Sequence, residues 1–346
     1  MIELGSYTIQ FICRPNHTFH FGNFSLYTET AMDDTAEIIH SDVLFSALIN
    51  VCAQHFGPES AAALVAAFAS GEVTISSAYY FLQVNNKQLL FFPKPATTEL
   101  FPAHEPKDIR RIRYVSGRIL QEGILPERWN TEECVIIDSA FVCLRQEIEQ
   151  LLPAEKHKLI RVFRKEFLHK VKVHKEVSDE DRLYSQINLV LCDNSALKLG
   201  VHFWSTLTIQ KDFVLSDTLL AALALLKATG IGGERSTLDS SFEDIIRTPA
   251  ERVAPTGTWI TLSLLHPMDE NQEGKYYRLL TRGGRRTADA GRLKAVRMIS
   301  EGMVARTIDD NGNNPIISNT SGDSVVRYGM ATYFPIHPQF YPEEIL

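Results

Sequence analysis

The sequence has no long hydrophobic run. Its apolar stretches are short and interrupted by polar residues, so none has the roughly 20 apolar residues that a transmembrane helix needs. Residues 1–5 do not resemble the beginning of a signal peptide either. We therefore expect a cytoplasmic protein without a membrane partner.

Cysteine is also scarce, and its spacing argues against several kinds of site. The cysteines number five, which is an odd count, and no two of them form a Cys-x-x-Cys pair. A zinc site or a disulfide framework needs clustered or paired cysteines. We expect reduced thiols, no metal site and no cofactor. The five residues are Cys13, Cys52, Cys134, Cys143 and Cys192.

The overall amino-acid composition is typical of a soluble globular protein. Of its residues, 45% are hydrophobic and 22% are charged. The length of 346 residues is sufficient for two domains, each with its own core. The net charge of −7 argues mildly against a nucleic-acid-binding protein. Residues 156–175 and 275–306 nevertheless contain many more basic than acidic side chains. Each basic run is either a solvated face or a contact with RNA.

The hydrophobic pattern predicts an α+β protein. A strand, a helix and two strands begin a ferredoxin-like unit, which has the RRM topology, and later strands with a helix begin a second one. We predict two ferredoxin-like (RRM-like) domains, residues 1–184 with inserted hairpins and residues 185–346 with a C-terminal glycine-rich loop. The predicted strands are 7–13, 73–84, 89–92, 160–173, 187–191, 197–209, 259–265, 276–281, 293–299 and 325–334; helices are predicted from 41 or 42 onward, over 58–69 and over 217–228.

The most distinctive stretch is a helix followed by a glycine-rich loop. Residues 217–228 contain neither Gly nor Pro and are rich in Ala and Leu, which favours a helix. Three of the four residues 230–233 are glycine, so the backbone there can approach a ligand closely. A Walker loop is excluded because it precedes its helix. Either the glycines cap the helix and form a turn, or the loop binds a nucleic-acid backbone together with Arg235 and Ser236.

The triplet His40-Ser41-Asp42 precedes the first predicted helix and has two interpretations. A serine directly beside its base is poorly placed for nucleophilic catalysis, because the members of a triad meet through folding. Capping by Ser41 or Asp42, with packing of the helix, is therefore the favoured interpretation.

Two further basic motifs could contact RNA. Lys170 and Lys172 alternate with valines in a strand-like pattern, which makes one face of the strand positive. Residues 282–286, Arg-Gly-Gly-Arg-Arg, form either a hairpin loop with solvated arginines or a second RNA-binding turn.

In these motifs the sequence resembles the RAMP (repeat-associated mysterious protein) superfamily of CRISPR proteins. A helix followed by Gly-Ile-Gly-Gly-Glu-Arg-Ser-Thr is similar to the C-terminal glycine-rich loop of that superfamily. His-Ser-Asp before Leu-Phe-Ser-Ala resembles the family of the fourth Csm subunit of subtype III-A. Acidic residues at 179–181 and Leu-Asp-Ser-Ser at 238–241 depart from the pattern of the relatives. Further matches follow in chain order at 75–78, 92–95, 173–185, 280–284 and 294–302.

The resemblance implies a structural RNA-binding subunit of a type III-A CRISPR effector complex, with no catalytic residue. Such a subunit binds the 5′ handle of crRNA and bridges the large polymerase-like subunit to the adjacent backbone RAMP subunit, while its mid-chain hairpin acts as a thumb against the RNA. We expect Gly232 and Gly233 to serve the RNA more than folding. The residues expected to contact RNA are Gly230, Ile231, Gly232, Gly233, Arg235, Ser236, Arg14, His40, Ser41, Lys94, Lys170, Lys172, His174, Lys175, Arg182, Arg282 and Arg285.

The alternative is a RAMP-class, metal-independent endoribonuclease that processes precursor crRNA. Such an enzyme needs a general base and a group that stabilises the leaving charge, and His17, His20 or His40 near Lys94 could supply them. A pure assembly scaffold is a third interpretation, but it leaves both glycine-arginine motifs unexplained.

Overall fold

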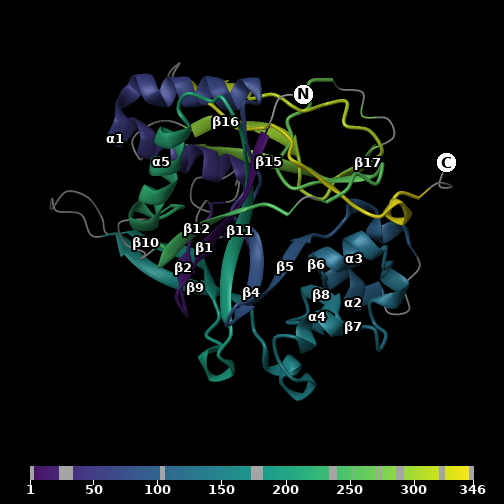
Figure 1. Ribbon diagram of the computed structural model, residues 1–346. Coiled ribbons are helices and arrows are strands. Elements are labelled where there is room, and N and C mark those ends of the chain that lie inside the picture. Colours follow the sequence, from purple (N-terminus) through teal and green to yellow (C-terminus); the bar gives the residue numbers. More distant parts are fainter. Residues whose placement is uncertain are drawn as a thin grey trace.

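The structure of the protein is a computed structural model. It describes residues 4–22, 34–101, 106–172, 182–233, 240–251, 253–269, 272, 275–285, 292–318 and 324–342. Its strands form one large sheet of nine strands, a three-stranded sheet, a four-stranded C-terminal sheet and two hairpins (Figure 1).

A ferredoxin-like unit forms one end of the large sheet. Its strands lie in the order β12-β1-β11-β4, with antiparallel pairing throughout. Helices α1 and α5 contact each other beside these strands (Figure 1). The elements follow one another as strand, helix, strand, strand, helix and strand. In the sheet the first of these strands (β1) lies between the third (β11) and the fourth (β12), as in a ferredoxin-like unit. Its elements are β1 (Leu4–Ile12), α1 (Ser41–Ser70), β3 (Val73–Ile75), β4 (Tyr79–Val84), β11 (Gly200–Gln210), α5 (Ser216–Thr229) and β12 (Asp244–Pro249).

The strand order corrects one prediction. Helix α5 matches the predicted helix 217–228 to within one residue at each end, but it does not begin a second unit. Strands β11 and β12 both pair with β1, one on each side, so β11, α5 and β12 complete the first unit. The predicted boundary between residues 184 and 185 lies within β10 (Arg182–Leu191). The division of the chain at that point stays a prediction.

Helix α1 joins two predicted helices through a kink. Gly57 has a φ of +88°, which interrupts the helical geometry. Pro58 follows directly, at the start of the second segment, where its missing N–H is not needed. The N-cap residue of α1 is His40. The prediction of Ser41 or Asp42 as the cap is therefore wrong, because both already belong to the first turn.

The residues between β4 and β11 extend the large sheet and add a long hairpin. Strand β5 (Lys87–Pro93) is followed across the sheet by β6 (Tyr114–Ser116), β8 (Phe141–Leu144) and β7 (Cys134–Ile137). Helices α2 (Pro106–Arg111), α3 (Gly117–Glu122) and α4 (Arg145–Glu149) lie in the same region. The hairpin consists of β9 (Phe163–Lys172) and β10, and β2 (Thr18–Phe19) joins it as a third strand. The 3-10 helices are η1 (Ala96–Leu100), η2 (Pro126–Arg128), η3 (Ala154–Leu159), η4 (Ser195–Leu197) and η5 (Pro338–Phe340).

The C-terminal strands form a separate, smaller sheet. Its order is β14 (Lys275–Tyr276), β17 (Val304–Ala305), β13 (Trp259–Thr261) and β20 (Tyr333–Pro335). Beside it, β15 (Leu279–Arg285) pairs with β16 (Arg292–Ile299), and β18 (Ile316–Ser318) pairs with β19 (Ser324–Val326). The single strand predicted over 325–334 is therefore two strands. Between them, Gly329 donates its N–H to Asn314 and accepts one from His266, so the backbone leaves the ladder.

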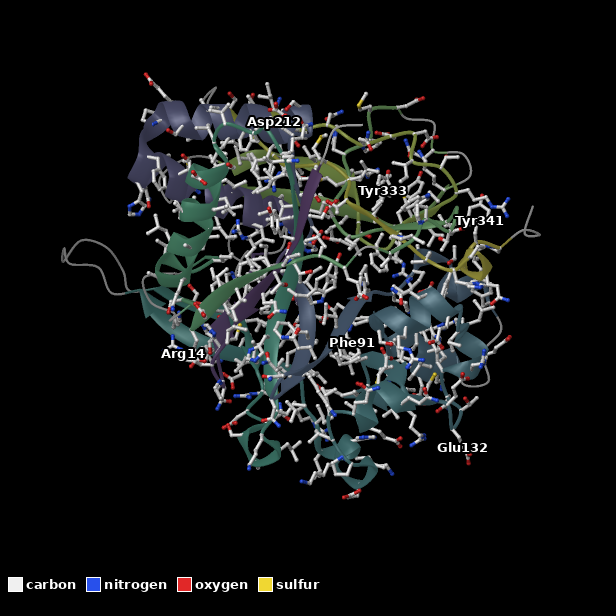
Figure 2. The ribbon with its side chains drawn as sticks, viewed as in Figure 1. Arg14, Phe91, Glu132, Asp212, Tyr333 and Tyr341 are labelled. Carbon is white, nitrogen blue, oxygen red and sulfur yellow. The ribbon has the colours of Figure 1, made fainter. Side chains whose placement is uncertain are left out.

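Aromatic side chains fill the interior. Phe19 and Phe21 stack with their ring centroids 5.2 Å apart. Phe91 is fully buried, whereas the charged Glu132 and Asp212 lie at the periphery (Figure 2). No helix within the described ranges is long and apolar enough to cross a membrane.

Candidate nucleic-acid interface

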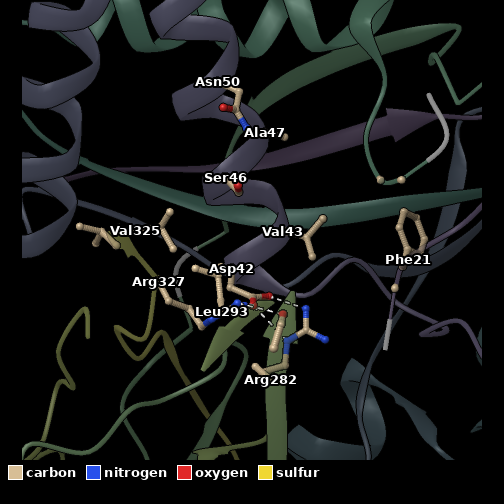
Figure 3. A pocket seen from close by; sticks show the side chains of 15 residues that line it. Phe21, Asp42, Val43, Ser46, Ala47, Asn50, Arg282, Leu293, Val325 and Arg327 are labelled. Carbon is tan, nitrogen blue, oxygen red and sulfur yellow. Dashed lines mark hydrogen bonds and ion pairs between the residues drawn. The ribbon is translucent and has the colours of Figure 1, made fainter. Parts of the chain in front are cut away.

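A pocket of about 390 Å³, the central pocket, brings distant segments of the chain together (Figure 3). Its lining includes the first turns of α1, the glycines that follow α5, the middle of β15 and residues 325–327. Residues 21–22 close one side. Both glycine-arginine motifs that the sequence singled out therefore contribute to one concave site.

The glycine-rich loop is shaped by close contacts with the backbone at His20. Gly230 caps α5 with its N–H donated to the Leu226 carbonyl at 2.9 Å, which confirms the capping interpretation for this residue. Gly232 has a φ of +107°, and a Cβ on it would lie 2.7 Å from the His20 carbonyl oxygen. Gly233 donates its N–H to the same oxygen at 2.9 Å. Gly232 therefore has a structural requirement of its own, and the amide of Gly233 is already used within the protein.

Arg282 lies inside strand β15, where the sequence predicted a turn. The strand continues to Arg285 through an irregularity in its register between Arg282 and Gly284. The Arg282 guanidinium makes two hydrogen bonds of 3.0 Å to the two carboxylate oxygens of Asp42, and only 4% of Arg282 is exposed. The interpretation of Arg282 as a solvated hairpin arginine is therefore wrong, because a buried ion pair holds it in the strand.

A second arginine completes this ion-pair cluster. Arg327 donates from Nη1 to Asp42 and from Nη2 to the Gly283 carbonyl, the latter at 2.9 Å. Burial by itself would raise the pKa of Asp42, but Arg282 and Arg327 outweigh that effect and hold the pKa well below its usual range. Asp42 therefore stays ionised, and the lining of the central pocket carries one more positive than negative charge.

His40 and Ser41 connect the start of α1 to the C-terminal half. His40 Nδ1 lies 2.7 Å from Glu301, and Ser77 Oγ donates to the same carboxylate at 2.5 Å. Burial would raise the pKa of Glu301, but the neighbouring His40 and Ser77 lower it overall. Ser41 Oγ accepts the N–H of Leu264 at 3.1 Å and is fully buried. These contacts support the packing part of that interpretation, because they join the start of α1 to the C-terminal half.

The remaining predicted residues lie away from the lining of the central pocket. Lys94 is buried and donates to the Ile109 carbonyl at 3.3 Å, and desolvation lowers its pKa to about 8. Arg14 donates to Ser241 Oγ at 3.1 Å, and Lys170 is half-buried on β9.

Several predicted residues lie wholly or partly outside the described structure. Lys172 and Arg182 face each other at the ends of β9 and β10, and their side chains are not described; the same holds for the side chain of Arg285 on β15. Arg235, Ser236, His174 and Lys175 lie outside the described residues, as does the acidic segment 179–181. Direct RNA contact by each of these residues stays a prediction.

Sequence reasoning missed the ionic partners in the pocket. The sequence offers Asp42 as a helix cap or as a member of the His40-Ser41-Asp42 triplet, and no pattern in it singles out Arg327. An acid in the first turn of a predicted helix is a weak local signal that could have drawn attention to Asp42. Arg327 carries no such signal, because its partners Asp42 and Gly283 lie 285 and 44 residues away in the chain.

The strand order defines the class of protein by fold: an α+β protein that contains a ferredoxin-like unit. No family model matches it. In sequence it is 26% identical over 254 residues to the CRISPR system Cms protein Csm4 of Methanocaldococcus jannaschii. That match covers 66% of this chain, and the chain spans 63% of the length of the relative.

Solved structures agree with this sequence similarity. The chain matches one in the crystal structure of a Csm3–Csm4 subcomplex of the type III-A CRISPR-Cas interference complex with a TM-score of 0.69 and 20% identity, over 96% of this chain and 100% of that one. A chain in a Csm1–Csm4 cassette in complex with cA4 matches with a TM-score of 0.57 and 17% identity, over 98% and 99%. In sequence and in fold the chain is similar to Csm4, which confirms the resemblance to the fourth Csm subunit and the predicted fold class.

Proposed function

We propose that this chain is an RNA-binding structural subunit of a type III-A CRISPR effector complex, and that it binds the 5′ handle of crRNA. The observation that carries the proposal is the central pocket, where the loop after α5, the middle of β15 and the first turns of α1 meet. Its lining has a net positive charge and includes Gly232, Gly233 and Gly283, which carry no side chain that would keep a ligand away from the backbone. Both features suit a phosphate backbone.

Arg282 carries one of the two positive charges in the lining of the central pocket, with 4% of the residue exposed. Its Nε and Nη2 face Asp42, so Nη1 is directed away from the carboxylate, on the side of Phe21 (Figure 3). The helix α1 begins at the same place, and the positive end of its dipole favours an anion there. Ser46 and Asn50 on the next turns add polar side chains to the lining.

We further propose that the chain bridges the large polymerase-like subunit and the adjacent backbone RAMP subunit. The support is that similar chains occur in crystals together with Csm3 and with Csm1. The large subunit and the backbone subunit would each need a separate face of this chain. Co-purification of the three subunits tests this part of the proposal.

We assign no catalytic step to the chain. The endoribonuclease alternative needs an accessible histidine as general base. His20 is buried and its Nδ1 lies 2.9 Å from the Ile187 carbonyl, while His40 is paired with Glu301. These contacts favour a structural use of both imidazoles.

The test compares Arg282→Gln with Arg128→Gln. The RNA used is a synthetic strand whose sequence is read from the 5′ end of RNA that co-purifies with the complex. A charge-assisted hydrogen bond contributes about 1.5–3 kcal/mol, so Arg282→Gln should weaken binding by roughly tenfold or more. Arg128 is an exposed arginine paired with Glu133 at 2.6 Å, outside the pocket, and its variant should bind normally. A folded Arg282→Gln variant with unchanged affinity would exclude the central pocket as the RNA site.

A further inference from the structure

The large sheet ends on one side in β12, which pairs only with β1 among the strands that the structure describes (Figure 1). Ala250 donates its N–H to the Ser6 carbonyl at 2.9 Å, and this bond fixes which backbone groups face β1. Because such groups alternate along an antiparallel ladder, the N–H and C=O groups of Ile245 and Arg247 point away from β1. Among the described residues, none accepts the N–H of either one.

Pro249 limits the length of this free edge. It occupies the next outward-facing position of β12, opposite Tyr7 of β1. Proline has no N–H, so it is tolerated in a sheet on the outer side of an edge strand. The groups that remain available for pairing are therefore those of Ile245 and Arg247, in the middle of the strand.

Two other end strands in the molecule are protected against pairing. Strand β7, at the far end of the large sheet, contacts η3 and α4. Strand β9, at the end of the three-stranded sheet, carries the cations Arg164, Lys165 and Lys170. A covering helix and a row of charges are both ways in which natural proteins prevent an edge strand from accepting another chain.

The edge of β12 lacks this protection, because its two charged side chains are held by the protein itself. The Arg247 guanidinium lies 4.8 Å from the centre of the Tyr7 ring. Lys227 of α5 donates to Asp244 at 3.2 Å. Between the two, the apolar Ile246 is 38% exposed. A strand with free backbone groups and an exposed apolar side chain favours pairing with a further strand.

The side chains beside this edge suit a protein strand better than RNA. On the face of the sheet that carries Ile246, Thr8 of β1 lies directly opposite Thr206 on one side and Thr248 on the other. None of these four side chains is a cation, so they offer no charge to phosphates. Resting on the proposed function, we propose that the edge of β12 binds an extended strand of the adjacent backbone RAMP subunit.

The backbone subunit fits because of its class. A RAMP protein contains ferredoxin-like units, and the sheet of such a unit ends in edge strands of its own. Two edge strands can pair through backbone hydrogen bonds without a matching side-chain sequence. The N–H and C=O groups of Ile245 and Arg247 would join the two chains, and the added strand would cover Ile246.

The experiment removes one outward N–H and leaves the pairing with β1 in place. Arg247→Pro does this, because the N–H of Arg247 points away from β1. Arg247→Ala is the matched control, since it also loses the contact with the Tyr7 ring but keeps the N–H. Titrations measure the affinity of the wild type and of both variants for the backbone RAMP subunit, for the large subunit and for handle RNA. Thermal melting verifies that each variant is folded.

The two variants should differ only toward the backbone subunit. Arg247→Pro should bind it about tenfold or more weakly than Arg247→Ala does, because one backbone hydrogen bond is lost and the proline ring obstructs the added strand. Affinities for the large subunit and for handle RNA should stay unchanged. Equal affinity of the two folded variants for the backbone subunit overturns the proposal. A loss of affinity for the large subunit or for RNA in its place also overturns it.

Hydrogen exchange provides a second test that needs no substitution and decides the matter if Arg247→Pro does not fold. The amides of Ile245 and Arg247 should exchange quickly in the chain alone and slowly once the backbone subunit is added. Unchanged exchange in the complex overturns the proposal. Protection that rises with the concentration of the chain alone also overturns it, because a second copy would then occupy the edge.

The same titrations separate this proposal from the proposed RNA binding. A wild type that binds the backbone subunit but not handle RNA would overturn the RNA-binding function and leave the edge proposal supported by the variants. A wild type that binds handle RNA but not the backbone subunit would overturn the edge proposal alone.

Discussion

Alanine substitution at two adjacent glycines should have very different effects on stability. Gly232 has a φ of +107°, a region that L residues rarely adopt, and its new Cβ would lie 2.7 Å from the His20 carbonyl oxygen. Backbone strain of this kind costs about 1–3 kcal/mol, and the loop must also move away from that oxygen, so we expect Gly232→Ala to lose about 2–4 kcal/mol. At Gly233 the nearest atom to a new Cβ is His20 Cδ2 at 3.3 Å, and φ is not restrictive. The loss there should stay below about 1 kcal/mol.

Thermal melting measures this difference directly. With an unfolding entropy of about 2.1 cal/mol/K per residue, each kcal/mol shifts the melting temperature of a chain of 346 residues by about 1.4 °C, so Gly232→Ala should melt roughly 3–6 °C below the wild type and Gly233→Ala within about 1.5 °C. Titration with handle RNA then tests the interface with the folded Gly233→Ala variant. Equal melting temperatures for the two variants would show that the contact with His20 does not constrain Gly232. Normal RNA binding by Gly233→Ala would remove Gly233 from the interface.

Three further predictions concern pH, charge and catalysis. Desolvation lowers the pKa of His202 to about 4, so below pH 6.5 the unfolded state binds more protons than the folded state. The free energy of unfolding should therefore fall by about 3 kcal/mol as the pH is lowered from 6.5 to 4. In denaturant titrations, His202→Gln should lose this part of the pH dependence. Reversing the charge of Lys170 and Lys172 should weaken binding of any single strand and flatten its salt dependence, and an unchanged slope would assign both to a protein interface. The purified protein should not cleave repeat RNA with or without Mg²⁺; specific cleavage that disappears in His40→Ala would instead support the endoribonuclease.

Local features of the sequence were sufficient to predict the two long helices α1 and α5 and the longest strands, but not the short helices α2, α3 and α4. The run of Ala and Leu without Gly or Pro determines α5, because helix propensity acts between residues a few positions apart. Gly57 and Pro58 likewise determine the kink in α1, since each restricts its own backbone. The glycines after α5 identified the loop that lines the central pocket, and the resemblance carried by these motifs led to the α+β fold class.

The arrangement of those elements was decided only by the tertiary structure. Strands β11 and β12 lie on either side of β1, and this pairing joins residues about 190 to 240 positions apart and has no signature in any of the segments. The same is true of the central pocket, where Arg282 meets Asp42 across 240 residues of chain. A charged residue in a sequence shows that it can form an ion pair, but its partner and its burial depend on which strands pair. The sequence alone therefore determined the local elements and the glycine-rich loop, while long-range packing determined that two arginines and a buried aspartate share one site.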